Sequence, residues 1–530
     1  MVKQPEYRER VDAWVDSHTE QMLEDVKTLV RIPSVRGEAK AGMPFGEMPA
    51  KALGAMRDLM EKYGLRTTDY DNYCVAGDLD AEGERHLDIL AHLDVVPVTE
   101  NWKTTSPFEP YVEGSRIYGR GTSDDKGPAI AALYAMRCIQ ELGLKLKHGV
   151  RLICGSDEEC GSGDLAYYYG REKEALHTFS PDADYPLINI EKGRLQKAFF
   201  AKGSSACPQS AGMQGGTVRV KSIRAGSAVN IVPGQGTLVV TGATQEMLQL
   251  AAQKTQEAAE KVLKDQQEAA EEALKDEQKA AGVMFSWESR DEEFVITASG
   301  KSSHAAHPMG GINSVTLILE FLKHLDLADA PGENMLLAAG RLWPHGDFHG
   351  EHLGVDYSDE ESGRLTMSLD TLEYDDVRVK SPEAEASLPA GGERGVDPPD
   401  TEGFRLEGTF DCRAPLCCTD ENLTRKIREK LQDAGFEMEE GTMVPGHYVS
   451  PESELVQKLL ESYELYFEKK GVPVAIGGGT YVHELERGVA FGCADPKVDN
   501  RMHGDDEFME IPMLVRSTKI FADAIMRLCG

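Results

Sequence analysis

Strand-like and helix-like runs alternate along residues 1–193, and this alternation constrains the fold more than any other feature. His86–Leu93 and Val150–Gly155 have the apolar composition of buried strands. Between them, Pro128 suits the first turn of a helix whose apolar residues recur at helical spacing: Ile130, Leu133, Met136, Ile139 and Leu142. A strand, a helix and a second strand in this order predict a parallel pair in an α/β sheet.

The α/β pattern is interrupted in the middle of the chain. Residues 194–446 predict short strands and helices of a separate unit, and Lys380–Thr401, dense in Pro, Gly and Glu, predicts a long loop. We therefore expect an α/β domain built from residues 1–193 and 447–530, with an inserted α+β domain of residues 194–446. The elements expected in the insert are strands over Thr217–Ile223, Thr237–Thr241, Phe294–Ala298, Leu365–Glu373 and Phe404–Cys412, and helices over Gln245–Ala281 and Ser314–Leu325.

Composition and charge exclude several classes of function. The net charge of −33 would repel the phosphates of nucleic acids and of anionic membranes. The sequence lacks an apolar run long enough for a membrane-spanning helix, and Met1–Arg10 is too charged for a secretory signal. The 10 cysteines are scattered without a Cys-x-x-Cys pair, which favours reduced thiols and a cytoplasmic location.

Acidic and histidine residues follow both predicted strands of the first domain. His92 and Asp94 stand two apart at the end of one strand, so they lie on the same side and Asp94 could fix the tautomer of His92. Asp157-Glu158-Glu159 follows the other strand, at the end where α/β sheets place their sites. One of these glutamates could bind a metal ion while its neighbour handles a proton.

Three further segments extend this chemistry along the chain. Gly119–Gly127 packs three glycines around Asp124 and its neighbour, and it lacks the pattern of a phosphate-binding loop. Asp182 and His503 stand in two other short segments, and together the five segments supply the imidazoles and carboxylates of a site for two zinc-like ions. Taken alone, His92 also fits an ordinary strand-end histidine, Gly119–Gly127 a glycine-rich turn with solvated charges, and Asp157–Glu159 a solvated acidic loop. His483-Glu484 is not a zincin motif, because Arg487 stands where the second histidine is required.

Taken together, these segments resemble the di-zinc metallopeptidases that include aminoacylase, carboxypeptidase G, carnosinase and the bacterial dipeptidase PepV. The resemblance implies a mixed-sheet α/β catalytic domain with an inserted α+β lid domain. The Pro-Asp-Ala form and the long insert favour the PepV branch. The matching segments are His92–Pro97, Gly119–Gly127, Asp157–Glu159, Ser180–Ala183, Gly300–Pro308 and His503.

The resemblance also implies which residues hold the metal ions. Asp124 would bridge both ions, which we expect to be Zn²⁺, with Mn²⁺ or Co²⁺ as alternatives. Glu159 and His503 would complete one site, and His92 and Asp182 the other. Each ion would then have three protein ligands and room for water and substrate.

Two further residues of the first domain receive catalytic roles from the resemblance. Asp94 would orient His92, and Glu158 would be the general base that activates water. The Asp124-Asp125 peptide bond is often cis in this family.

The insert is expected to supply substrate-binding residues. His304, the first histidine of the lid motif, would stabilise the developing oxyanion, while His307 would be structural. In dimeric relatives the partner subunit supplies this histidine, whereas the long insert here predicts an internal supply and a monomer. Asn230 resembles a lid residue that helps to bind substrate, although Gly234 follows where relatives often carry an acid.

A free carboxylate on the substrate is the expected determinant of recognition. Arg413, in an Asp-x-Arg-x-Pro motif, would bind this carboxylate with two parallel hydrogen bonds. Gly478 and Gly479 would add backbone donors. The expected enzyme is a cytoplasmic, metal-dependent dipeptidase whose partners are small peptides, with neither nucleic acid nor membrane.

Two alternatives accompany this expectation. An N-acyl-amino-acid or succinyl-diaminopimelate amidohydrolase would share every metal-binding residue, so only substrates separate it from a dipeptidase. A non-catalytic homologue would have lost Glu158 or a metal ligand, and this sequence retains all of them.

Overall fold

The structure is a computed structural model that describes residues 5–204, 216–269, 284–376 and 403–530. The chain forms two units, each described here by itself. The first unit consists of Met1–Glu191 and His447–Gly530, and the second of Lys192–Gly446. No helix in these described ranges is long and apolar enough to cross a membrane.

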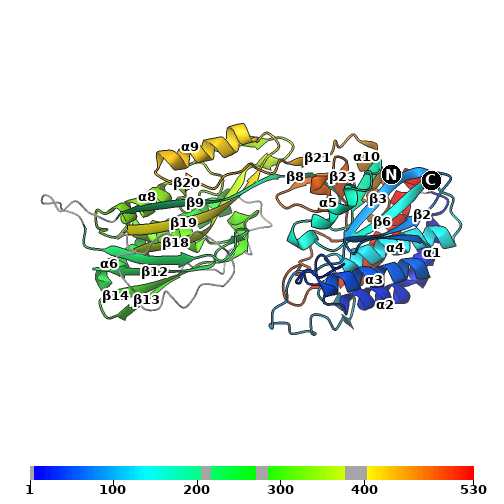
Figure 1. Cartoon of the computed structure of the whole chain (residues 1–530), viewed down its shortest axis with the longest axis horizontal. Coiled ribbons are helices and arrows are strands. Elements are labelled where there is room, and N and C mark those ends of the chain that lie inside the picture. The colour runs from blue at the N-terminus through cyan, green and yellow to red at the C-terminus, as the bar shows by residue number, and fades with distance from the viewer. Residues whose placement is uncertain (1–4, 205–215, 270–283, 377–402) are drawn as a thin grey trace. The chain divides into compact units, whose positions relative to one another are not determined.

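A mixed sheet forms the centre of the first unit, in the order β1-β2-β6-β3-β7-β23-β8-β21, with β22 beside β8 (Figure 1). The strand–helix–strand prediction is confirmed, because β3 and β6 are parallel and α4 connects them. Strand β7 is parallel to β3, whereas β1, β2 and β6 pair antiparallel. The strands are β1 (Arg66–Tyr70), β2 (Cys74–Leu79), β3 (Gly83–His92), β6 (His148–Gly155), β7 (His177–Ser180), β8 (Ile188–Glu191), β21 (His447–Tyr448), β22 (Val474–Ile476) and β23 (Gly488–Ala490).

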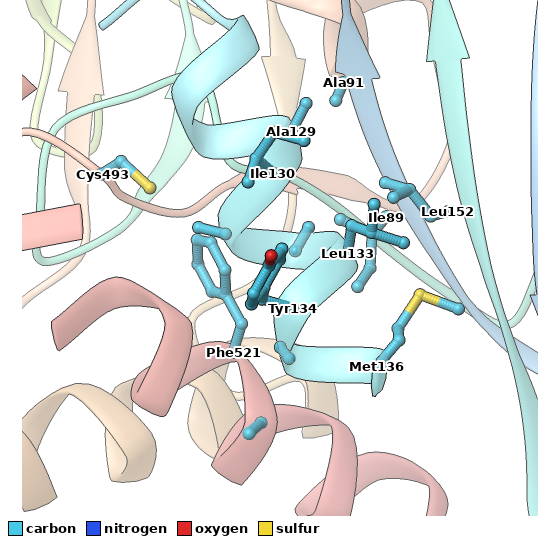
Figure 2. Close-up of a cluster of buried hydrophobic side chains, with 14 of the residues drawn as sticks. Ile89, Ala91, Ala129, Ile130, Leu133, Tyr134, Met136, Leu152, Cys493 and Phe521 are labelled. Atoms are coloured by element: carbon cyan, nitrogen blue, oxygen red, sulfur yellow. The ribbon is translucent and has the colours of Figure 1, made fainter. Parts of the chain in front are cut away.

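Helix α4 (Lys126–Glu141) lies in the middle of the core of this unit. Its apolar residues are buried on all sides, which is typical of a helix enclosed between two layers. Figure 2 shows Ile89 and Leu152 of the sheet on one side of α4, and Phe521 on another. The other helices are α1 (Arg8–Ser17), α2 (Thr19–Val30), α3 (Glu47–Lys62), α5 (Gly163–Tyr169), α10 (Glu454–Phe467) and α11 (Ile511–Cys529).

A small three-stranded sheet joins distant parts of the first unit. Its order is β24-β5-β4, from β4 (Tyr111–Glu113), β5 (Arg116–Tyr118) and β24 (Phe508–Glu510). Strand β24 pairs antiparallel with β5, so the segment that follows His503 is held against the segment that precedes Asp124.

The second unit contains an antiparallel sheet in the order β13-β14-β12-β10-β18-β19-β9-β20. The five strands predicted for the insert correspond to β10, β12, β14, β18 and β19. Of the one or two helices predicted over Gln245–Ala281, the described part is α6 (Gln245–Ala269), and residues 270–281 and Lys380–Thr401 lie outside the described residues. The elements are β9 (Gly193–Ser204), β10 (Arg219–Ala225), β12 (Gln235–Thr241), α6 (Gln245–Ala269), β13 (Met284–Arg290), β14 (Glu293–Ser299), α7 (Ser314–Leu322), α8 (Pro331–Leu342), β18 (Thr366–Asp376), β19 (Gly403–Ala414), α9 (Arg425–Asp433) and β20 (Glu437–Met438).

Candidate metal centre

The ends of three parallel strands bring the first group of candidate ligands together. His92 is the last residue of β3 and is in register with Gly155, the last residue of β6. Asp182 follows the end of β7, which lies on the other side of β3. Because parallel strands end at the same edge of a sheet, the residues that follow them converge there.

Asp124 lies in the tight turn that precedes α4. Gly121 has a φ of +88°, which a residue with a side chain rarely adopts. A Cβ on Gly127 would lie 2.1 Å from the carbonyl oxygen of Thr122, so only glycine fits there. The Asp124-Asp125 peptide bond is cis, as the resemblance implies. The Asp125 carboxylate accepts a hydrogen bond of 3.1 Å from the backbone N–H of His92, which joins this turn to the end of β3.

Asp124 is shared between two groups of candidate ligands. Its Oδ1 lies 2.9 Å from Nε2 of His92, which in turn lies 3.5 Å from Oδ2 of Asp182. Its Oδ2 lies 2.9 Å from Nε2 of His503, which lies 3.2 Å from Oε1 of Glu159. Within each group the three ligand atoms lie within 4.8 Å of one another. The two oxygens of one carboxylate therefore face two different imidazoles.

The residues present fit a pair of metal ions. Nε2 of His92 and Oδ1 of Asp124 are both buried, and although they lie 2.9 Å apart, neither makes a well-aligned hydrogen bond with any residue that the structure describes. Buried polar atoms are almost always partnered, so a bound cation would account for both of them. Two imidazoles and three carboxylates suit Zn²⁺, Mn²⁺ or Co²⁺.

The position of the proton on His92 is also suited to metal binding. Nδ1 lies 3.1 Å from the backbone carbonyl oxygen of Asp94 and 3.5 Å from its carboxylate. A proton on Nδ1 that is donated to this carbonyl leaves the lone pair of Nε2 directed at Asp124. The carbonyl of Asp94, rather than the carboxylate expected from the sequence, is thus the nearer partner.

The carboxylate of Asp94 instead holds the acidic turn after β6. It accepts hydrogen bonds from the backbone N–H groups of Glu158, at 3.2 Å, and of Glu159, at 3.1 Å. Asp94 itself is 1% exposed, so the two bonds form away from competing water. One buried side chain therefore positions both the candidate general base and a candidate metal ligand.

Two of the candidate ligands, His503 and Glu159, have raised pKa values when metal is absent. Hydrogen bonds to Asp124 and Glu159 raise the pKa of His503 to about 11, although burial opposes them. Burial raises the pKa of Glu159 to about 7. Burial, with the charges of Asp182 and Glu159, also holds the pKa of Glu158 well above its ordinary value, and His92 opposes this shift. Metal ions would replace protons at His503 and Glu159, so binding is expected to release protons.

Tyr481 and Asp164, which the sequence did not indicate, contact residues in and beside the candidate metal centre. The ring of Tyr481 packs edge-on against that of His92, with centroids 5.9 Å apart and an interplanar angle of 87°. The hydroxyl of Tyr481 donates to Asp164, which also accepts from the backbone N–H of Asp157 at 2.9 Å. The contacts of Tyr481 with His92 and Asp164 join positions far apart in the chain, so no local sequence motif predicts them.

The glycine-rich loop at Gly478 and Gly479 immediately precedes this tyrosine. It is anchored by Glu191, whose carboxylate accepts from the backbone and hydroxyl of Thr480 and lies 2.9 Å from Nδ1 of His483. His483 is therefore engaged by a buried glutamate, in keeping with the rejection of a zincin motif.

The candidate oxyanion donor lies in the second unit. His304 is exposed, and its short strand β15 (Ser303–His304) pairs with β11 (Ile231–Val232). The backbone N–H of Ala306 donates to Nδ1 of His304 at 3.0 Å, so the neutral ring carries its proton on Nε2. Asn230 is adjacent, because its carbonyl accepts from the N–H of Ala305 at 2.9 Å.

The candidate carboxylate-binding arginine is buried in the sheet of the second unit. Nε and Nη2 of Arg413 donate to the two oxygens of Asp411, at 2.6 and 2.8 Å. Gln196 donates to the same carboxylate at 2.6 Å. Asp411 thus fixes the plane of the guanidinium from one edge.

Comparison with known proteins places the chain in a peptidase family. The model of "Peptidase family M20/M25/M40" matches residues 89–527. The putative dipeptidase YtjP of Bacillus subtilis (strain 168) is 31% identical over 523 residues, covering 96% of this chain and 97% of the relative. The putative dipeptidase SAB1611c of Staphylococcus aureus (strain bovine RF122 / ET3-1) is 29% identical over 520 residues, covering 97% and 98%.

Solved structures share the fold. Human carnosine dipeptidase 1 aligns with a TM-score of 0.55 at 13% identity, covering 99% of each chain. The dipeptidase Dug1p of Saccharomyces cerevisiae aligns with a TM-score of 0.52 at 12% identity, covering 98% of each chain. At such identities the likeness shows the fold alone.

Proposed function

The chain belongs to peptidase family M20/M25/M40 and is a metallopeptidase, and from this premise we propose that it is a dipeptidase. Its substrates would be short peptides with a free C-terminal carboxylate. The observation that carries the two-metal chemistry of this proposal is the sharing of Asp124 between two groups of candidate ligands, each completed by a histidine and a carboxylate. The relatives named as putative dipeptidases add support, because the chain matches them over almost its whole length.

Five residues would hold two divalent ions, Zn²⁺ or alternatively Mn²⁺ or Co²⁺. His92 and Asp182 would bind one, Glu159 and His503 the other, and Asp124 both. When bound, the ions lower the pKa of water and polarise the scissile carbonyl group.

Glu158 would move the proton in the reaction. Its carboxyl is partly buried, and its pKa stands above the ordinary value because of burial. A base with a raised pKa accepts a proton from water more readily, and it can return that proton to the leaving amine. The turn that carries Glu158 is held by the Asp94 carboxylate, so the base would be positioned before substrate binds.

The second unit would bind the substrate. Nε2–H of His304 would donate to the oxyanion that develops on the carbonyl oxygen, since Nδ1 already accepts from Ala306. Arg413 would bind the terminal carboxylate, while Asn230, Gly478 and Gly479 would add polar contacts. In this proposal, residues 194–446 act as the lid of a catalytic domain formed by residues 1–193 and 447–530.

We further propose that the enzyme acts as a monomer in the cytoplasm. An internal His304 removes the need for a partner subunit. The cysteines in the described part of the chain are all free thiols, which suits a reducing compartment. Sedimentation of the active enzyme at assay concentration tests the monomer, and a dimer that loses activity on dilution would contradict it.

Hydrolysis of a substrate panel by the metal-stripped protein tests the function. Zn²⁺, Mn²⁺ or Co²⁺ would be added back separately, and the panel would contain α-dipeptides, a β-alanyl dipeptide, a tripeptide, and N-acetyl and N-succinyl amino acids. We expect metal-dependent cleavage confined to dipeptides. Cleavage of N-acyl substrates alone would identify an amidohydrolase that uses the same site.

A further inference from the structure

Glu507 is a fully buried carboxylate that the reaction described above does not use. It is 0% exposed and lies in the loop that carries His503, immediately before β24. The run Asp505-Asp506-Glu507 resembles a solvated acidic turn in the sequence, yet its last member is directed into the protein.

The carboxylate of Glu507 gathers four donors from the turn that contains Asp124. Oε1 accepts from the backbone N–H groups of Ser123, at 2.9 Å, Gly121, at 3.0 Å, and Asp124, at 3.3 Å. Oε2 accepts from Nη1 of Arg120 at 2.7 Å and from the N–H of Gly121 at 3.1 Å. Arg120 is itself only 2% exposed, so opposite charges meet away from water.

The same two segments are also joined through their backbones. The N–H of Gly119 donates to the carbonyl of Glu507 at 3.0 Å, and Phe508 pairs with Tyr118 where β24 meets β5. Glu507 therefore lies at the junction between the loop of one candidate metal ligand and the turn of another.

We propose that Glu507 is a positioning residue that holds Asp124 and His503 in register before the metal ions bind. The proposal rests on the proposed function, in which Asp124 bridges the ions. Glu507 would bind no metal and touch no substrate. It would fix the backbone of the turn, so that the two oxygens of Asp124 face His92 and His503 at the observed 2.9 Å. Residues that orient metal ligands in this way commonly change metal affinity when they are replaced.

The chain supplies a matched control in the preceding residue. Asp506 lies in the same loop and is 5% exposed. Its Oδ1 accepts from the backbone N–H groups of Lys103, at 2.9 Å, and Thr104, at 2.7 Å, which lie outside the turn of Asp124. Its φ of 57° suits asparagine, so Asp506→Asn loosens the loop without straining its backbone.

Metal affinity without substrate tests the proposal. The wild type, Glu507→Gln and Asp506→Asn would be stripped of metal and titrated with Zn²⁺ against a chromophoric chelator. We expect Glu507→Gln to bind both ions about 10- to 100-fold more weakly, and Asp506→Asn to change affinity by less than about 3-fold. Wild-type affinity in Glu507→Gln, or an equal loss in Asp506→Asn, would overturn the proposal.

Hydrogen exchange of the wild type keeps the proposal testable if Glu507→Gln does not fold. In the metal-stripped protein, the amides of Gly121, Ser123 and Asp124 should be protected from exchange as strongly as those of the first turns of α4. Rapid exchange that slows only when Zn²⁺ is added would show that metal, rather than Glu507, orders the turn. The titration and the exchange need no peptide, so a failure of dipeptide hydrolysis leaves this test unaffected.

Discussion

The two units of the chain position their candidate functional residues in different ways. In the first unit, buried groups far along the chain hold several of these residues, as Asp94 holds Glu158 and Glu159. In the second unit, near neighbours in sequence fix the two side chains themselves: Ala306 donates to the ring of His304, and Asp411 accepts from Arg413. If the proposed roles hold, the candidate metal ligands of the first unit are arranged before metal binds, and the candidate substrate donors of the second unit are ordered locally.

Replacement of the shared ligand should have the largest effect. Asp124→Asn removes the negative charge of the shared carboxylate and replaces one of its two oxygens with an NH2 group that cannot bind a cation, so we expect loss of both metals and a fall in kcat/KM of about 10³- to 10⁴-fold or more. Metal content by mass spectrometry and dipeptide hydrolysis would be measured together, with the exposed Glu20→Gln as control. Retention of two tightly bound ions would contradict the bridging role.

Replacement of the proposed base should separate chemistry from metal binding. In Glu158→Gln the side chain keeps its size but cannot accept a proton, so kcat should fall by about 10²- to 10⁴-fold while both ions remain bound. The fall in kcat should be much larger than any change in KM. An active Glu158→Gln enzyme would refute the base assignment.

Replacement of the exposed His304 in the second unit should lower kcat without changing the metal content. His304→Ala removes the Nε2–H donor, and we expect a loss of about 10²- to 10³-fold in kcat at unchanged metal content. His324→Ala, in the same unit, is the control. If His304→Ala lost metal ions as readily as activity, the proposed division of roles between the units would be wrong.

Replacement of Arg413 should weaken recognition of the substrate's C-terminal carboxylate. Truncation to alanine would leave the buried Asp411 carboxylate without its positively charged partner, so Arg413→Lys is the better variant because it keeps the charge and loses the planar fork. We expect kcat/KM for dipeptides to fall about 10- to 100-fold, in line with the worth of a charged hydrogen bond. C-terminally amidated peptides should change little, and equal losses on both would contradict the carboxylate role.

Lowering the pH should weaken metal binding, because protons compete with metal for Glu159 and His503, which both belong to the first unit. The metal-free pKa values are about 7 for Glu159 and about 11 for His503. Metal binds only the deprotonated groups, so both protons must leave below pH 7, whereas only that of His503 must leave between pH 7 and 11. As the pH is lowered from 11 to 7, these two groups should make metal affinity fall about tenfold per pH unit, and below pH 7 the fall should be steeper. Calorimetry in buffers of different ionisation enthalpy measures the protons released, and an affinity independent of pH would contradict the ligand set.

Local patterns in the sequence predicted much of the fold. The mixed α/β class is confirmed, and β3, α4 and β6 lie within a few residues of the predicted strands and helix, because apolar periodicity is a property of each segment alone. The resemblance implied a mixed sheet, but neither the order of its strands nor which of them pair antiparallel was predicted, since these depend on contacts between distant segments. Lys380–Thr401 lies outside the described residues, so the predicted loop there stays a prediction.

The candidate site, like the fold, was predicted only in part: its possible metal ligands were predicted, but the residues that support them were not. His92, Asp124, Asp182, Glu159 and His503 lie together as their motifs predicted, although their binding of metal stays a prediction. The supporting residues were missed because their partners are remote. Arg120 and Glu507 are 387 positions apart, and Tyr481 and Asp164 are 317 apart, so no spacing rule connects them.

The most direct test is the dependence of dipeptide hydrolysis on the number of metal ions bound per chain. Metal-stripped protein would be titrated with Zn²⁺ or Mn²⁺ while bound metal and hydrolysis are measured on the same samples. The shared position of Asp124 predicts negligible hydrolysis without metal and a plateau at two ions per chain. Full hydrolysis by the metal-free protein, or a plateau with a single ion bound, would contradict a two-metal dipeptidase.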